Sequence, residues 1–213
     1  MKIEILKNNI DSESRYYSFN DTCNIVPNDN VIYMAVKHYL SNQRQATSMT
    51  KNRGNITGSS RKIQKQKGTG NARKGDIKSP ILRGGGTAFG PINNNYSFKI
   101  NKKIKFIAKK SAFLHQVNNN NVFIIDDIAL DKPNTKYIAN IIDKYKLNKF
   151  KNLFVISEYN KNLLLSFRNL KDNNIVVAKD LNVYNIIKYN KLIFTLESIK
   201  IIENIFCFKN KKS

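Results

Sequence analysis

The stretch NVFIIDDIALDKPNTKYIANIIDKYKLNKFKNLFVIS (residues 121–157) holds two short apolar runs separated by a pattern of helical periodicity. VFII (122–125) and LFVI (153–156) have the length and the continuous apolar character of buried strands. Between them, apolar side chains recur at i, i+3, i+4 and i+7, as on one face of a helix: Ile138, Ile141, Ile142 and Tyr145. Asn134 is placed to cap that helix. The stretch therefore predicts a strand–helix–strand unit.

The same alternation continues on both sides of this stretch. IVVA (175–178) and KLIFT (191–195) predict two more strands, and a last helix with Thr195 as its cap carries Ile199, Ile202 and Phe206 on one face. Near the N-terminus, KIEIL (2–6) predicts a strand and NVIYMAVKHYL (30–40) a helix. Continuous apolar strands joined by helices indicate an α/β fold with a doubly wound, mostly parallel sheet that is covered on both faces.

Residues 44–90 have a different composition. They contain all nine glycines, eleven Lys or Arg residues, one acid (Asp76) and seven large apolar residues. Glycine disfavours helix and strand alike, and so few apolar side chains cannot offset the entropy lost on ordering. We therefore expect a globular α/β domain made of residues 1–43 and 99–213, with an extended loop at residues 44–98 inserted after the first helix.

Two interpretations of this loop are open: a disordered tether, or an extension that becomes ordered on a partner. The run RGGGTAFGP (83–91) favours the second, because a triple glycine is expected where the backbone must pass close to another group.

The charge balance points to a polyanion. Lys and Arg outnumber Asp and Glu by 37 to 15, so the formal net charge is +22, which attracts phosphates at long range. Five of the seven arginines fall between residues 44 and 83, where little acid opposes them. This combination favours nucleic acid as the partner. Arginine donates hydrogen bonds to phosphate oxygens from its planar guanidinium, and glycine lets backbone N–H groups come close to the same oxygens.

Other site types find little support. Gly70–Gly75 has the glycine spacing of a phosphate-binding P-loop, but Asp76 stands where that motif requires Lys, and no complete GxGxxG occurs. Asp126 and Asp127 follow a strand and are expected to be loop or capping residues, while His38 and His115 lie in predicted helices as packing or surface residues. Cys23 and Cys207 form neither a metal motif nor a disulfide framework. We expect no cofactor, no metal and no catalytic group.

The N-terminal residues are charged and lack a long apolar run, so we also expect neither a signal peptide nor a membrane span. An internal, reducing compartment fits this pattern.

QKGTGNARKGDIKSPILRGGGTAFGP (66–91) resembles the signature of the universal family of the large ribosomal subunit's protein number four, and LNVYNIIKYNKLIFTLESIKIIE (181–203) resembles that family's closing segment. The helix before the loop and NKKIKFIAKKSAF (101–113) after it occur in the family's order. The resemblance implies a structural protein of a bacterial-type ribosome, with partners among large-subunit ribosomal RNA (rRNA), neighbouring ribosomal proteins and the nascent peptide. A cytoplasmic ribosome is expected, and an organellar one is the alternative.

In this family the loop is threaded into rRNA and its tip helps to line the nascent-peptide exit tunnel. By position, the tunnel tip here is Lys65, Gln66, Lys67, Gly68, Thr69 and Gly70. The rRNA-binding residues that we expect are Arg44, Lys51, Arg53, Arg61, Lys62, Lys65, Lys67, Gly68, Gly70, Arg73, Lys74, Lys78, Arg83, Gly84, Gly85 and Gly86.

The sequence departs from the family's usual pattern at three positions of the loop. Gln64 and Leu82 stand where tryptophan is common, and Asn71 replaces an arginine. Stacking of an aromatic side chain on a base is therefore lost at position 64. Two rival functions remain at this point: a nucleotide-dependent enzyme built on the α/β sheet, and a free regulatory RNA-binding module.

Overall fold

The computed structural model describes residues 2–6, 15–18, 26–128 and 130–208. Cys23 and the side chain of Cys207 lie outside this part, so the expectation about the cysteines is not addressed by the structure. The chain divides into two compact units, Met1–Tyr39 with Lys99–Ser213 and, separately, Leu40–Phe98. We call the first the globular unit and describe each unit by itself.

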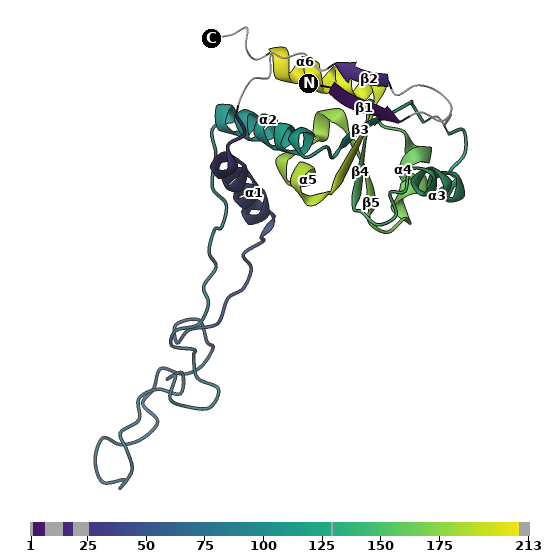
Figure 1. The fold of residues 1–213 in the computed structure, drawn as a ribbon. Helices are drawn as coiled ribbons and strands as arrows, with labels where there is room; N and C mark the ends of the chain where they lie inside the picture. The colour runs from purple at the N-terminus through teal and green to yellow at the C-terminus, as the bar shows by residue number, and fades with distance from the viewer. Residues whose placement is uncertain (1, 7–14, 19–25, 129, 209–213) are drawn as a thin grey trace. The chain divides into compact units, whose positions relative to one another are not determined.

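The helices and strands of the chain follow the alternation that the apolar pattern predicts (Figure 1). In chain order they are β1 (Lys2–Leu6), β2 (Arg15–Ser18), α1 (Asp29–Gln43), α2 (Lys102–Asn118), β3 (Val122–Ile125), α3 (Thr135–Lys144), β4 (Asn152–Ile156), α4 (Lys161–Arg168), β5 (Asn173–Val177), a 3₁₀ turn (Ala178–Asp180), α5 (Val183–Lys188), β6 (Lys191–Thr195) and α6 (Leu196–Phe208). The predicted strand at 175–178 begins two residues earlier and ends at Val177, and the first helix extends beyond its predicted end at residue 40.

The six strands form one sheet in the order β2-β1-β3-β6-β4-β5. The pairs β1–β3, β3–β6, β6–β4 and β4–β5 are parallel, and β1–β2 alone is antiparallel among the described strands. The expectation of a doubly wound, mostly parallel sheet is confirmed. β6 inserts between β3 and β4 although it is the last strand in the chain.

Each face of the sheet is covered by its own layer of apolar side chains, because successive residues of a strand point to opposite faces. In β4, Leu153 and Val155 join a core cluster that includes residues of α1, α2, α5 and α6, whereas Phe154 joins a second cluster with α3 and α4. Figure 1 shows α3 and α4 side by side on their face of the sheet. This double coverage explains why the strands are continuous apolar runs.

Both helix caps that the sequence predicts are present. The side chain of Asn134 accepts a hydrogen bond from the backbone N–H of Tyr137 at 3.1 Å, which satisfies a donor at the start of α3. Thr195 Oγ1 accepts from the backbone N–H of Ser198 at 3.3 Å at the start of α6. Both helices therefore begin where these local signals place them.

The edge strand β2 was not predicted. Its sequence RYYS has no apolar run, and its pairing with β1 places Tyr17 opposite Ile3. The Tyr17 hydroxyl donates to Glu203 Oε2 of α6 at 2.8 Å. Burial, followed by this hydrogen bond and the negative charge of Glu203, raises the pKa of Tyr17 to about 12.

Candidate nucleic-acid interface

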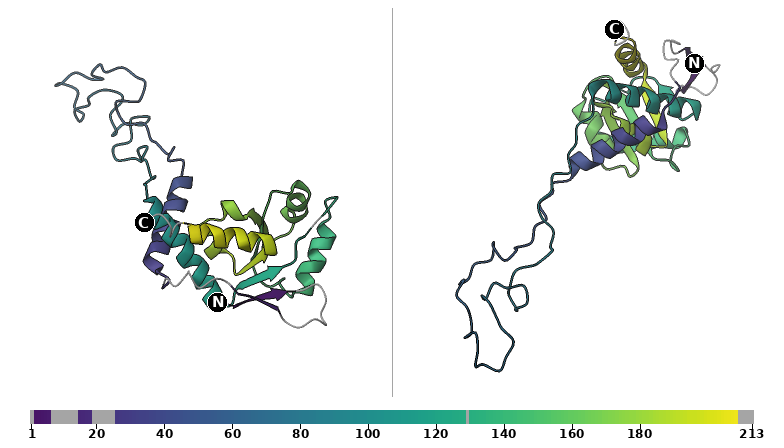
Figure 2. Two further views of the ribbon diagram at one scale, coloured as in Figure 1. Left: turned by 90° about the horizontal axis from the view of Figure 1, so that it is seen from above. Right: turned by 90° about the vertical axis from the view of Figure 1, so that its left-hand side faces the viewer.

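Residues 44–100 contain no regular helix or strand, and the structure describes all of them. We divide the loop into a first leg (residues 44–63), a tip lobe (64–74) and a second leg (75–98). Figures 1 and 2 show these parts as an open hairpin. No strand precedes Gly70–Gly75 and no helix follows it within this segment, so the geometry of a phosphate-binding P-loop is missing as well as its lysine.

Backbone hydrogen bonds hold the two legs together at several levels. The N–H of Thr50 donates to the carbonyl of Pro91 at 2.9 Å, and the N–H of Thr87 donates to the carbonyl of Lys51 at 3.0 Å. Nearer the tip, the N–H of Ile63 donates to the carbonyl of Gly75 at 3.0 Å and closes the tip lobe. The predicted tip, Lys65–Gly70, lies within this lobe.

The legs touch at the triple glycine. A Cβ built on Gly86 would overlap the backbone nitrogen of Arg53 and lie 2.6 Å from the carbonyl carbon of Asn52, while one built on Gly85 would overlap the carbonyl oxygen of Ser79. At Gly85 and Gly86 the close approach predicted for the triple glycine is therefore an approach to the chain's own backbone, whereas a Cβ built on Gly84 meets no atom within 4 Å. The N–H groups of Gly85 and Gly86 donate to the carbonyls of Leu82 and Lys78, both at 3.0 Å.

A further contact joins the ends of the loop. The guanidinium of Arg44 lies 3.6 Å from the ring centroid of Tyr96, within cation–π distance. Sequence reasoning missed this pair, because nothing in the local pattern links two residues that lie so far apart along the chain. The contact occupies one face of the Tyr96 ring.

The loop has almost no interior. Its buried residues are Asp76 and Gly86, and most of its large apolar side chains are more than a third exposed: Met49, Ile63, Ile77, Ile81, Phe89, Ile92, Tyr96 and Phe98. Gln64 and Leu82 are half-buried and Asn71 is exposed. Packing of apolar surface therefore contributes little to the shape of the loop, as its composition predicts.

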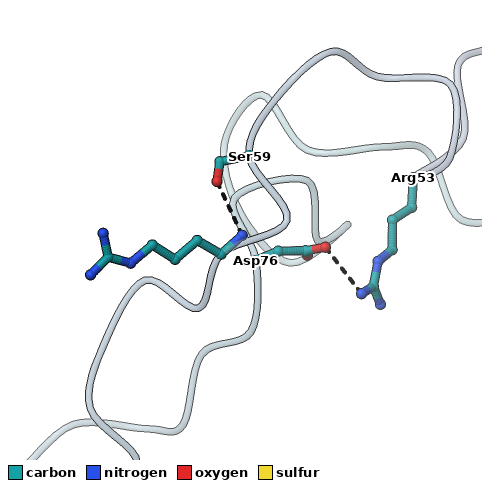
Figure 3. Close-up of polar contacts among 4 residues, drawn as sticks. Arg53, Ser59 and Asp76 are labelled. Atoms are coloured by element: carbon teal, nitrogen blue, oxygen red, sulfur yellow. Dashed lines mark hydrogen bonds and ion pairs between the residues drawn. The ribbon is translucent and has the colours of Figure 1, made fainter.

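Asp76, the one acid of the loop, is 8% exposed. Its Oδ2 pairs with Arg53 Nη2 at 3.1 Å across the two legs, as Figure 3 shows. Its Oδ1 is buried and has no hydrogen-bond partner in the described structure. Because this carboxylate is enclosed and faces a guanidinium, it contributes little negative potential to the outside of the loop.

The cations that the sequence singles out lie at the surface. Ten of the eleven Lys and Arg residues in 44–90 are exposed, and Lys78 is half-buried. Four of the predicted residues meet at a hollow of about 420 Å³ between the legs: Arg53, Lys62, Arg73 and Lys74. Ser60, Gln66, Gly75 and Asp76 complete its lining. The arrangement gives an open, strongly cationic surface suited to phosphate groups.

The aspartates and histidines considered from the sequence lie at separate places in the globular unit. Asp126 and Asp127 are exposed at the end of β3, and Asp127 lines an open hollow with Glu158 and Thr195 at the carboxyl ends of β3, β4 and β6. His115 Nδ1 lies 3.3 Å from Asn119 Nδ2 at the end of α2. No cluster of three or more His, Cys, Asp or Glu side chains among the described residues is arranged to hold a metal ion.

His38 lies at a separate hollow of the globular unit, which Tyr39, Lys105 and Tyr184 also line. Burial, and to a lesser extent the positive charge of Lys105, lowers the pKa of His38 below its ordinary value. The described helices include none with the length and apolar character needed to cross a membrane.

Comparison with known proteins places this architecture in a family. Residues 19–205 match the model of the Ribosomal protein L4/L1 family. The chain is similar to the large ribosomal subunit protein uL4 of Flavobacterium johnsoniae, with 43% identity over 204 residues that cover 95% of this chain and 98% of the relative. The proteins of the same name from Phocaeicola vulgatus and Parabacteroides distasonis are 41% and 39% identical, over 96% and 97% of this chain and 99% of each relative. The chain belongs to the ribosomal protein L4/L1 family.

Proposed function

We propose that this protein is a structural constituent of the large subunit of a bacterial ribosome in the cytoplasm, and that it binds large-subunit rRNA through residues 44–98. Its family is one of ribosomal proteins and not of enzymes. The bacterial relatives are named as large-subunit proteins and match this chain over nearly its whole length. Neighbouring ribosomal proteins are the other partners that the assignment implies.

The observation that carries the proposal is the combination of exposed cations with a missing interior. Ten exposed Lys and Arg side chains lie on a segment whose single acid is enclosed, and whose backbone is joined by few hydrogen bonds between the legs. Such a segment gains order when phosphates supply the counter-charge that the chain itself lacks. RNA is then the environment in which the loop takes its working shape.

We assign this contact to the residues expected from the sequence and propose a separate role for each group of them. Exposed arginines and lysines contact phosphate oxygens, and the hollow of Arg53, Lys62, Arg73 and Lys74 receives the backbone of one RNA strand. Gly86 allows the two legs to approach each other, Gly85 allows the second leg to turn back against its own Ser79, and Gly84 supplies a positive φ of 78° between Arg83 and that turn. Lys65–Gly70 form the tip that lines the peptide exit tunnel and meets the nascent chain.

The test is the salt dependence of rRNA binding. Replacing Arg61, Lys62, Arg73 and Lys74 by glutamine removes four phosphate contacts and keeps the Arg53–Asp76 ion pair, so the slope of log K against log salt falls by about 3. The matched control replaces four exposed lysines of the globular unit by glutamine: Lys132, Lys136, Lys146 and Lys149. Both variants have the same net charge. If the loop is the rRNA-binding element, the slope of log K against log salt should fall more in the loop variant than in the control.

Binding by intact particles separates the rival functions. A core component cosediments with large subunits at high salt, whereas a free regulatory RNA-binding module dissociates as its counterion-driven affinity falls. A nucleotide-dependent enzyme would bind ATP or NAD at micromolar concentration, and we expect no such binding. Equal slopes for the two glutamine variants would refute the assignment of the loop as the rRNA-binding element.

A further inference from the structure

The aromatic residues of the loop are Phe89, Tyr96 and Phe98, and they differ in how far they are covered. Tyr96 is 38% exposed and stacks with Arg44, and Phe98 is 37% exposed. The Phe89 ring is 103% exposed, so neither of its faces is covered within the loop. Phe89 is therefore the aromatic side chain that this segment leaves open.

The backbone on both sides of Phe89 is anchored to the first leg. Before it, the N–H of Thr87 donates to the carbonyl of Lys51 at 3.0 Å; after it, the carbonyl of Pro91 accepts from the N–H of Thr50 at 2.9 Å and from its hydroxyl at 3.3 Å. A Cβ built on Gly90 would overlap the Thr50 side chain, so this position is closely packed. Phe89 thus lies between two points at which the second leg is hydrogen-bonded to the first.

A phenyl ring gains free energy when it leaves water, so a ring held outward on a hydrogen-bonded backbone is available to an apolar partner. The partner must also tolerate eleven cations with a single, enclosed acid around it. A nucleic-acid base meets both requirements, because it offers a flat apolar face on a polyanionic chain. An apolar protein surface meets only the first.

Resting on the proposed function above, we propose that Phe89 stacks on an unpaired base of the RNA that the loop binds. The phosphates on either side of that base lie against the cations of the two legs, while the ring covers one face of the base. Stacking of this kind depends on the flat face that every base presents, so it adds affinity with little sequence preference. It supplies, at position 89, an aromatic contact of the kind that Gln64 cannot make.

The chain contains no tryptophan, which allows a direct test. The F89W variant places an indole at the proposed contact, and Y159W places one on an exposed tyrosine of the globular unit as a control. On addition of large-subunit rRNA, we expect the fluorescence of F89W to be quenched and shielded from acrylamide, as an indole stacked on a base would be. The fluorescence of Y159W should remain open to acrylamide.

Affinity measurements complete the test. Phe89→Leu keeps an apolar side chain but removes the ring, and should weaken rRNA binding about tenfold, with the salt slope unchanged because no charge is lost. Ile81→Ala, at a side chain that is 93% exposed in the same leg, should change binding less than twofold. Phe89→Tyr keeps the aromatic ring and should therefore bind rRNA with wild-type affinity. This contrast with Phe89→Leu would show that the ring, and not apolar bulk, makes the contact.

The outcomes separate this inference from the function on which it rests. If the wild-type protein fails to bind rRNA with a steep salt slope, the proposed function fails. If it binds, but F89W stays open to acrylamide and Phe89→Leu binds like wild type, the stacking proposal alone is refuted. Shielding of F89W in intact large subunits but not in complexes with rRNA would show a protein partner and would also refute it.

Discussion

Replacing Gly86 by alanine tests whether contact between the two legs shapes the rRNA-binding loop. The added Cβ would overlap the backbone of Arg53, which lies on the opposite leg and has no flexible end to give way. The legs must then separate. Moving residue 86 away from Arg53 would break two hydrogen bonds of 3.0 Å: that of Gly86 N–H to Lys78 within the second leg, and that of Thr87 N–H to Lys51 across the legs.

The expected magnitude follows from those two bonds. Each contributes about 1 kcal/mol net, so reaching the closed arrangement of the legs costs the alanine variant about 2 kcal/mol more than the wild type. If RNA binds the closed arrangement, affinity falls about 30-fold. Because the substitution changes no charge, the loss should be the same at low and high salt.

Gly54 provides the matched control. It lies on the first leg outside the cationic hollow, and a Cβ built there meets only the side-chain oxygen of Asn52, at 3.4 Å. Gly54→Ala should therefore leave affinity for large-subunit rRNA within about twofold of wild type, since a compatible alanine mainly restricts the unbound chain. Filter binding of the three proteins at two salt concentrations provides the comparison. Equal affinity of Gly86→Ala and Gly54→Ala would refute the inference that leg contact matters for binding.

Two further predictions concern the globular unit. The folded pKa of Tyr17 is about 12, above the ordinary tyrosine value, so the stability from its hydrogen bond to Glu203 is complete below about pH 10 and is lost as the pH rises through 12. Alkaline absorbance titration should show a late phenolate component. Tyr17→Phe should remove this component, and Tyr16→Phe should retain it. Asn134→Ala should lower the free energy of unfolding by about 1 kcal/mol in urea titrations, whereas Asn134→Asp should stay close to wild type because its carboxylate can accept the same bond from Tyr137. A loss of the same size in both Asn134 variants would show that the cap is not the cause.

The elements that the sequence predicts are those whose signals are local. VFII and KLIFT are continuous apolar runs because both faces of the sheet are covered, and they match β3 and β6 closely. The caps at Asn134 and Thr195 involve donors only three residues away. β2 was not predicted because an edge strand does not need a continuous apolar run. Its partners are β1 and Glu203 of α6, which the local sequence around β2 does not indicate.

In the loop, too, some features could be predicted from the sequence and others could not. Its cations and its lack of an apolar interior could be predicted from composition, since these depend only on which residues are present. Composition could not show that Gly86 lies against Arg53, that Arg44 stacks on Tyr96, or that Phe89 is held outward.

The sequence by itself determined the α/β class, the family resemblance, the helix caps and the cationic character of the loop, because each rests on neighbouring residues or on their sum. Only the tertiary structure decided that β6 lies between β3 and β4, and that Asp76 is enclosed against Arg53 on the opposite leg. The physical reason is that strand order and leg pairing are contacts between segments far apart in the chain. Their free energy depends on which surfaces meet in space, and no local pattern records that choice.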